Sequence, residues 1–361
     1  MPALFEPIKV GTCALSNRIV MAPLTRFRND DALVPIPELM PEHYAARCLV
    51  PGTLIIGEAT DICELGGGYN NVPGIYTDAQ VAGWKKVTDA VHAKGGFMFL
   101  QLWALGRVNP GNKVTDVTGA SAIKDDSVDA TPREMTTEEV VGFEDAYVHA
   151  SKCAIAAGFD GIEIHGAHGY LVDQFLQDVS NKRTDIYGGS VENRARFALN
   201  IIDKVSAAIG EEKVAIRLSP FNNFQGMGMK DHYPTFSYVI SQIEAKHPKL
   251  AYLHVVEPRV SGGADREVHE GETTDVYKKL WSGPWIAAGG FTPETALKYA
   301  EEHENSLVAF GRYFISNPDL VAKIKEGIPL TPYNRDTFYL PKDPKGYLDY
   351  SYAEELKGKY Y

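Results

Sequence analysis

Residues 136–170 read TTEEVVGFEDAYVHASKCAIAAGFDGIEIHGAHGY, and this stretch predicts a helix, a strand and a polar loop in succession. Thr136 and Glu139 form a capping box, which indicates the start of a helix, and Gly158 indicates its end. The run Gly161–His165 then predicts a strand, along which isoleucines occupy one face and Glu163 shares the other with His165. A helix followed by a strand and a polar loop is typical of α/β proteins.

The same alternation continues through the whole chain. Ser190 is a candidate N-cap for a helix that runs to about Gly210, and Thr292 followed by Pro293 indicates another helix start. The predicted strands number eight: Arg18–Ala22, Thr53–Ile56, Gly96–Gln101, Gly161–His165, Val214–Leu218, Leu253–Val256, Trp285–Ala288 and Leu307–Phe310. Strands that alternate with helices predict a parallel α/β architecture.

Two parallel architectures fit this pattern. A doubly wound sheet is expected to carry a glycine-rich turn after its first strand, with an acidic residue about 20 residues later. Here the first strand leads into APLTRFR, which has no such glycines. A length of 361 residues fits two average domains or one barrel with insertions. We therefore predict the α/β class and a single-domain (β/α)8 TIM barrel.

The composition and net charge of the chain exclude some classes of binding partner. The chain is 44% hydrophobic and carries a formal net charge of −11, which argues against nucleic acid and against an anionic membrane surface. No apolar run approaches the ~20 residues of a spanning helix, and the start MPALFEPIKVG lacks the pattern of a signal peptide. We expect a soluble, cytoplasmic protein with a small-molecule substrate and no membrane partner.

The four cysteines are widely separated and form no metal-binding or redox motif. We expect them to be buried, reduced thiols, and we predict no metal. They are Cys13, Cys48, Cys63 and Cys153.

In a barrel of this kind the active site is built from residues that follow the strands, at the C-terminal face. These positions are rich in polar, cationic and glycine residues, as a site for a phosphorylated ligand should be. They are Pro23–Thr25, Glu58–Ala59, Gln101–Trp103, His165–Tyr170, Arg217, Glu257, Gly289–Gly290 and Gly311–Arg312.

Several motifs along nearly the whole chain resemble the Old Yellow Enzyme family, in the order in which that family has them. The motifs are APLTR at 22–26, QLW at 101–103, GFDGIEIHGAHGYLVDQFL at 158–176, SNKRTDIYGGSVENRARF at 180–197, RLSP at 217–220, FGRYFISNPDL at 310–320 and PYNRDTFY at 332–339. The resemblance, closest to fungal members, implies that residues 1–361 form one FMN-binding TIM-barrel domain with a short N-terminal cap and a C-terminal extension. It also implies hydride transfer from NADPH, or from NADH, through FMN to an activated C=C bond.

His165, His168 and Tyr170 are the candidate catalytic and substrate-binding residues. Two imidazole N–H donors can polarise a carbonyl or nitro oxygen and stabilise the negative charge that develops on it. A lone histidine is usually structural, and zinc is the other alternative, but no carboxylate or cysteine completes a metal set nearby. Tyr170 matches the family's proton donor, and its alternative is a packing role. Many family members have Asn at the position of His168.

The resemblance assigns a second group of residues to the flavin ring, His165 among them. Arg217 would favour the reduced flavin, with a surface ion pair as its alternative. Gln101 would bind the pyrimidine edge, Thr25 would lie near O4, and Ala59 would let the backbone approach the ring. Pro23 and Leu24 belong to the same cofactor-binding loop.

The phosphate of FMN is expected at the turns after strands seven and eight. Backbone N–H groups of Gly289, Gly290 and Gly311 would hold its oxygens, and Arg312 would supply positive charge. Glycine pairs alone are weak signals in a chain with 33 glycines, so their placement after these strands carries the assignment.

Tyr69, Trp103, Phe291 and Tyr339 are aromatic candidates for the walls of the substrate cavity, with ordinary core packing as the alternative. The segment 259–272 looks shortened relative to many members of the family, which leaves the substrate open.

The expected activity is a ping-pong reduction of an α,β-unsaturated carbonyl or nitro compound. Flavin N5 would deliver hydride to the β-carbon, and Tyr170 would protonate the α-carbon, in a monomer or a homodimer. Three alternatives remain: a pathway-specific reductase or isomerase of secondary metabolism, a flavin-bearing protein that binds phenols or steroids, and a flavin-free barrel enzyme for phosphorylated sugars.

Overall fold

Eight parallel strands close into a barrel in the computed structural model, which describes residues 2–361. Around the barrel their order is β3-β4-β5-β8-β9-β10-β13-β14. Their bounds are β3 (Ile19–Met21), β4 (Leu54–Asp61), β5 (Phe97–Trp103), β8 (Gly161–Gly166), β9 (Val214–Leu218), β10 (Tyr252–Val256), β13 (Trp285–Ala288) and β14 (Ser306–Phe310). The predicted (β/α)8 barrel is confirmed, and each predicted strand has its counterpart.

Two strands run at least two residues past their predicted C-terminal ends. β4 continues to Asp61 and β5 to Trp103, whereas the sequence placed their ends at Ile56 and Gln101. The register between these strands shifts at Gly57/Thr60, and this irregularity lets pairing resume beyond the expected end. Glu58–Ala59 and Gln101–Trp103 therefore lie within the last residues of their strands rather than after them.

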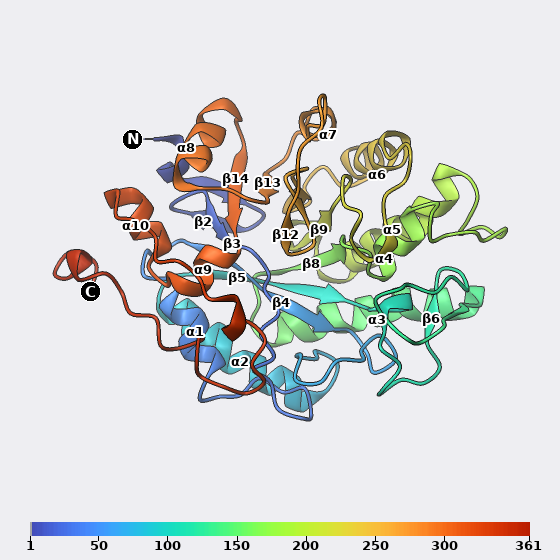
Figure 1. The fold of residues 1–361 in the computed structure, drawn as a ribbon, viewed down its shortest axis with the longest axis horizontal. Coiled ribbons are helices and arrows are strands. Elements are labelled where there is room, and N and C mark those ends of the chain that lie inside the picture. Colours follow the sequence, from blue (N-terminus) through green and yellow to red (C-terminus); the bar gives the residue numbers. More distant parts are fainter. Residues whose placement is uncertain (1) are drawn as a thin grey trace.

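Helices surround the barrel, as Figure 1 shows. Their bounds are α1 (Met40–Ala46), α2 (Asp78–Ala93), α3 (Thr137–Ala156), α4 (Leu171–Leu176), α5 (Val191–Ile209), α6 (Tyr233–Lys246), α7 (Asp275–Lys278), α8 (Pro293–Glu302), α9 (Arg312–Ser316) and α10 (Leu320–Glu326). The predicted caps at Thr136, Ser190 and Thr292 all accept a hydrogen bond from the backbone three residues later. No helix within residues 2–361 is both long and apolar enough to cross a membrane.

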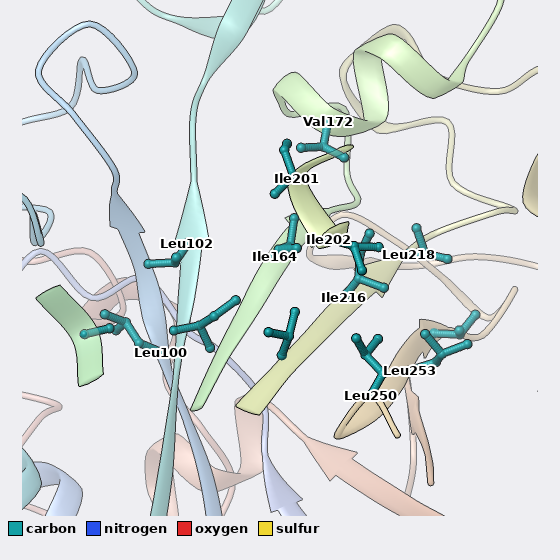
Figure 2. Close-up of a cluster of buried hydrophobic side chains, with 14 of the residues drawn as sticks. Leu100, Leu102, Ile164, Val172, Ile201, Ile202, Ile216, Leu218, Leu250 and Leu253 are labelled. Carbon is teal, nitrogen blue, oxygen red and sulfur yellow. The ribbon is translucent and has the colours of Figure 1, made fainter. Parts of the chain in front are cut away.

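Side chains alternate along each strand, so that one set packs against the helices and the other set points into the barrel. Ile162 and Ile164 of β8 belong to the large apolar cluster between barrel and helices, part of which Figure 2 shows around Ile164, Ile216 and Leu218. The intervening Glu163 is fully buried among groups from other strands inside the barrel. Apolar packing therefore holds the helices on the outside and leaves the inside available for polar chemistry.

A hairpin covers the N-terminal end of the barrel. It consists of β1 (Ile8–Val10) and β2 (Cys13–Leu15), and its side chains pack in one cluster with Leu54 and Leu307 at the start of their strands. This packing covers the N-terminal end of the barrel.

The cysteines depart in part from expectation. All four are unpaired, but only Cys13 and Cys48 are buried, while Cys63 and Cys153 are half-buried. Cys63 lies two residues after β4 and Cys153 lies on α3, and neighbouring elements cover both incompletely.

Candidate active site

A cavity of about 690 Å³ opens at the C-terminal end of the barrel. It gathers every residue that the sequence nominated for cofactor, substrate or catalysis. These are Pro23, Leu24, Thr25, Ala59, Tyr69, Gln101, Trp103, His165, His168, Tyr170, Arg217, Gly289, Gly290, Phe291, Gly311, Arg312 and Tyr339.

Two acidic residues that were expected at this face do not line the cavity. Glu58 is fully buried beside Tyr44, whose hydroxyl donates to its Oε1 at 3.1 Å. Glu257 accepts a 2.6 Å hydrogen bond from the hydroxyl of Thr274. Both carboxyls are thus turned toward the helical layer and away from the ligand space.

The HGAHGY stretch forms a tight turn between β8 and α4. His168 has a φ of +58°, and its backbone N–H donates to Ser219 Oγ at 2.8 Å. The next residue, Gly169, also has a positive φ, and its N–H donates to Asp173 Oδ2 at 2.9 Å. These bonds satisfy two backbone N–H groups of the turn that carries His168 and Tyr170.

The three side chains face one another across a short span. The ring centroids of His165 and His168 are 6.1 Å apart with planes at 89°, and those of His165 and Tyr170 are 4.8 Å apart. Trp103 packs edge-on against Tyr170 with centroids 4.7 Å apart. One small ligand can therefore contact both imidazoles and the phenol.

Burial sets the protonation of these groups. Burial, reinforced by the charge of Arg217, holds the pKa values of His165 and His168 well below their ordinary value, so both imidazoles are neutral at pH 7. Burial likewise raises the pKa of Tyr170 above its usual range, so that its phenol keeps its proton. Two neutral imidazoles and one protonated phenol are suited to binding an oxygen and donating a proton.

Several buried polar atoms here have no partner within the protein. They include Nδ1 of His165, Nδ1 of His168, Nε of Arg217 and Nη1 of Arg312. Unpartnered buried donors are costly, and their concentration around one cavity indicates a polar ligand that satisfies them. A flavin with its carbonyl-bearing ring and phosphate fits this donor set, and Arg217, Gln101, Thr25 and Ala59 all line the cavity.

The expected phosphate end is also assembled. Gly289 and Gly290 have φ values of +120° and +61°, and a Cβ on Gly289 would approach Val260 Cγ2 to 2.7 Å. Only glycine fits there without strain. Arg312, however, already pairs with Asp265 Oδ1 at 2.6 Å, so its guanidinium is shared between an acidic side chain and the ligand space.

The sequence did not identify several other residues that line the cavity. They are Phe27, Phe224, Gln225, Val260, Asp265, Tyr333, Arg335 and Phe338. Most belong to loops and to the segment 333–339, which reaches the cavity from the far end of the chain. Arg26 brings that segment in, because its Nε donates to Phe338 O at 3.0 Å and its Nη2 to Gly346 O at 2.6 Å. The motif PYNRDTFY and the segment 259–272 contain five of these residues, but neither pattern indicated which side chains face the cavity.

Comparison with known proteins agrees with this geometry. Residues 3–331 match the model of the NADH:flavin oxidoreductase / NADH oxidase family. The chanoclavine-I aldehyde reductase fgaOx3 of Penicillium roqueforti is 47% identical over 99% of this chain and 98% of its own. The NADP-dependent oxidoreductase lnbE of Aspergillus flavus is 47% identical over 98% and 97%. The crystal structure of Old Yellow Enzyme from Pichia sp. superposes with a TM-score of 0.90 and 39% identity, covering 98% of this chain and 94% of its own.

Proposed function

This chain belongs to the NADH:flavin oxidoreductase / NADH oxidase family, as an FMN-binding oxidoreductase of the Old Yellow Enzyme type, and from that premise we propose that it reduces the activated C=C bond of an α,β-unsaturated carbonyl or nitro compound with NADPH as the hydride source. The observation that carries the proposal is the cluster of His165, His168 and Tyr170 over one end of the cavity.

Each side chain of the cluster has a task that its chemistry supports. The neutral imidazoles of His165 and His168 donate N–H to the substrate oxygen, which polarises the C=C bond and holds its reacting end in place. Tyr170 keeps its phenolic proton because burial raises its pKa, and it donates that proton to the α-carbon. FMN, when bound, supplies the hydride chemistry that links the nicotinamide to the substrate.

The remaining residues hold the cofactor. Arg217 and Gln101 both line the cavity, and half-buried Arg217 would place its positive charge near the ring of the reduced flavin, which is negative. Gly289, Gly290, Gly311 and Arg312 form the end that receives the phosphate.

Rapid-mixing measurements of the two half-reactions test the proposal. In Tyr170→Phe, reduction of the flavin by NADPH should stay within about twofold of wild type. Its reoxidation by 2-cyclohexenone should slow by two or more orders of magnitude, because general acid catalysis contributes about 10²–10⁴-fold. Equal loss in both half-reactions would remove Tyr170 from its role, and a protein without NADPH-driven turnover would favour a flavin-bearing binding protein.

A more specialised function has its own support. Aromatic side chains ring the cavity mouth, with Phe27 edge-on to both Tyr69 and Tyr339 at centroid distances of 6.3 and 5.7 Å. Such a rim favours a large apolar substrate, and one relative is by name a chanoclavine-I aldehyde reductase. Turnover of bulky unsaturated aldehydes at least tenfold above 2-cyclohexenone in kcat/KM would select a pathway-specific reductase.

A further inference from the structure

A buried carboxylate lies behind the cavity floor. Glu163 points into the barrel from β8 and is fully buried, as is His254 of β10. Glu163 Oε1 accepts from Gln101 Nε2 at 2.8 Å, and Glu163 Oε2 lies 2.8 Å from His254 Nδ1. These two contacts connect strands β5, β8 and β10 inside the barrel.

The charge states of this cluster follow from its surroundings. Burial would raise the pKa of Glu163, but His254, Arg217 and the hydrogen bond from Gln101 hold that pKa below its usual value, so the carboxylate is ionised. Burial lowers the pKa of His254, so its imidazole is neutral. We therefore assign the electrostatic part of the lowered pKa of Glu163 chiefly to the permanent positive charge of Arg217. An ionised carboxylate only accepts hydrogen bonds, so His254 carries its proton on Nδ1 and donates to it.

The same reasoning fixes the amide of Gln101. A carboxylate can face only the NH2 end of an amide, because a flip would place Gln101 Oε1 against Glu163 Oε1 and leave two acceptors in contact. Gln101 lines the cavity, and no donor within residues 2–361 bonds its Oε1. The floor therefore offers the ligand an acceptor at this point, as the imide N–H of a flavin requires.

We propose that Glu163, supported by His254, is a positioning residue that locks Gln101 with its carbonyl oxygen toward the cofactor and so sets the affinity for FMN. This inference rests on the proposed placement of FMN over Gln101. Glu163 does not touch the ligand; it acts through the amide.

The affinity for FMN, measured from flavin released on serial dilution of the holoenzyme, tests the proposal. Glu163→Leu removes the acceptor and frees the amide to flip, so FMN should bind about tenfold to a hundredfold more weakly. Glu163→Gln is the conservative variant. It returns one acceptor to Gln101, and His254 can shift its proton to Nε2 to match, so affinity should return to within about threefold of wild type.

This pair of variants separates positioning from charge. If Glu163 acted by its charge on Arg217, the neutral Gln and Leu variants would weaken binding equally, and the proposal would be wrong. In a Gln101→Leu background, Glu163→Leu should cause no further loss, because the group through which it acts is gone. A full additional loss there would also overturn the proposal.

A matched control exists on α3. Glu144 is 1% exposed and accepts hydrogen bonds from Tyr187 and Asn200, but it lies outside the barrel. Glu144→Leu should lower stability and leave FMN affinity unchanged. An equal loss of FMN in this variant would show that Glu163→Leu reports only general damage.

Should Glu163→Leu fail to fold, His254 gives the same test from the other side. His254→Asn keeps an N–H for Glu163 Oε2 and His254→Leu does not, so only the latter should weaken FMN binding. If the variants show this pattern of FMN affinity but the wild-type enzyme does not reduce enones, only the proposed function is wrong. If the wild-type enzyme reduces enones but the variants bind FMN as tightly as it does, only this inference is wrong.

Discussion

At the scale of single residues, the backbone at His168 explains which side chains the turn accepts. A φ of +58° is strained for most residues, and asparagine and histidine are among those that tolerate it best. Both also carry an N–H donor. The conformation and the need for a donor therefore both favour histidine or asparagine at this position.

His168→Asn should fold as wild type and keep the KM for 2-cyclohexenone within about threefold, since conformation and donor both survive. His168→Val should lose about 1–2 kcal/mol of unfolding free energy, because a β-branched residue is strained at this φ, and KM should rise about tenfold or more. Urea unfolding and steady-state kinetics measure the two effects.

Asn305→Val is the control for strain alone, because Asn305 has a φ of +54° and lies outside the cavity. It should lower stability without changing KM. Unchanged stability in His168→Val would contradict the account of strain.

At the scale of elements, the short hairpin of β11 (Val260–Ser261) and β12 (Ala264–Asp265) forms one wall of the cavity. Two arginines from the end of the chain hold it. Arg312 pairs with Asp265 at 2.6 Å, and Arg335 Nη2 donates to Gly263 O at 3.1 Å. Because Asp265 is largely exposed, its pair with Arg312 is weak and open to competition from a phosphate.

Asp265→Asn should therefore strengthen FMN binding, by about twofold to fivefold, because Arg312 no longer divides its charge between a carboxylate and the phosphate. The Kd for FMN at low ionic strength is the measurement, and the gain should shrink at 0.5 M salt. Asp231→Asn, on another loop outside the cavity, is the control. Weaker binding in Asp265→Asn would mean that the ion pair shapes the phosphate site instead of competing with it.

At the scale of the whole molecule, buried carboxyls give stability an unusual dependence on pH. Burial raises the pKa of Asp61 to about 7, opposed in part by the Trp103 N–H, whereas in the unfolded chain it is about 4. Between these values the folded state holds a proton that the unfolded state has lost. The contribution of Asp61 to stability therefore falls as pH rises from about 4 to about 7. His165 and His168 act in the opposite sense, because their depressed pKa values cost stability as pH falls below about 6.5.

Asp61→Asn should flatten this dependence. It removes up to about 1.4 kcal/mol per pH unit from the decline in unfolding free energy between pH 4 and pH 7. Urea unfolding at pH 5 and pH 7 measures it, with the exposed Asp89→Asn as control. A parallel shift of the curve at both pH values would mean that Asp61 does not carry the buried proton.

Features that depend on neighbours along the chain could be predicted before the fold was known. Caps at Thr136, Ser190 and Thr292 and the two-residue alternation of Gly161–His165 are local patterns, and the barrel could be predicted from patterns of this kind. The roles of most cavity residues were predicted from the resemblance to the Old Yellow Enzyme family. The extent of β4, by contrast, depends on its pairing with β5 across the irregularity at Gly57.

Other features of the site depend on contacts between residues far apart in the chain. The contact of Arg26 with Phe338, the sharing of Arg312 with Asp265 and the orientation that Glu163 imposes on Gln101 join residues 312, 47 and 62 positions apart. No local pattern encodes such pairs, because closure of the barrel and the course of its loops bring them together. Those contacts, and not the motifs, determine which atoms the site presents to its ligand.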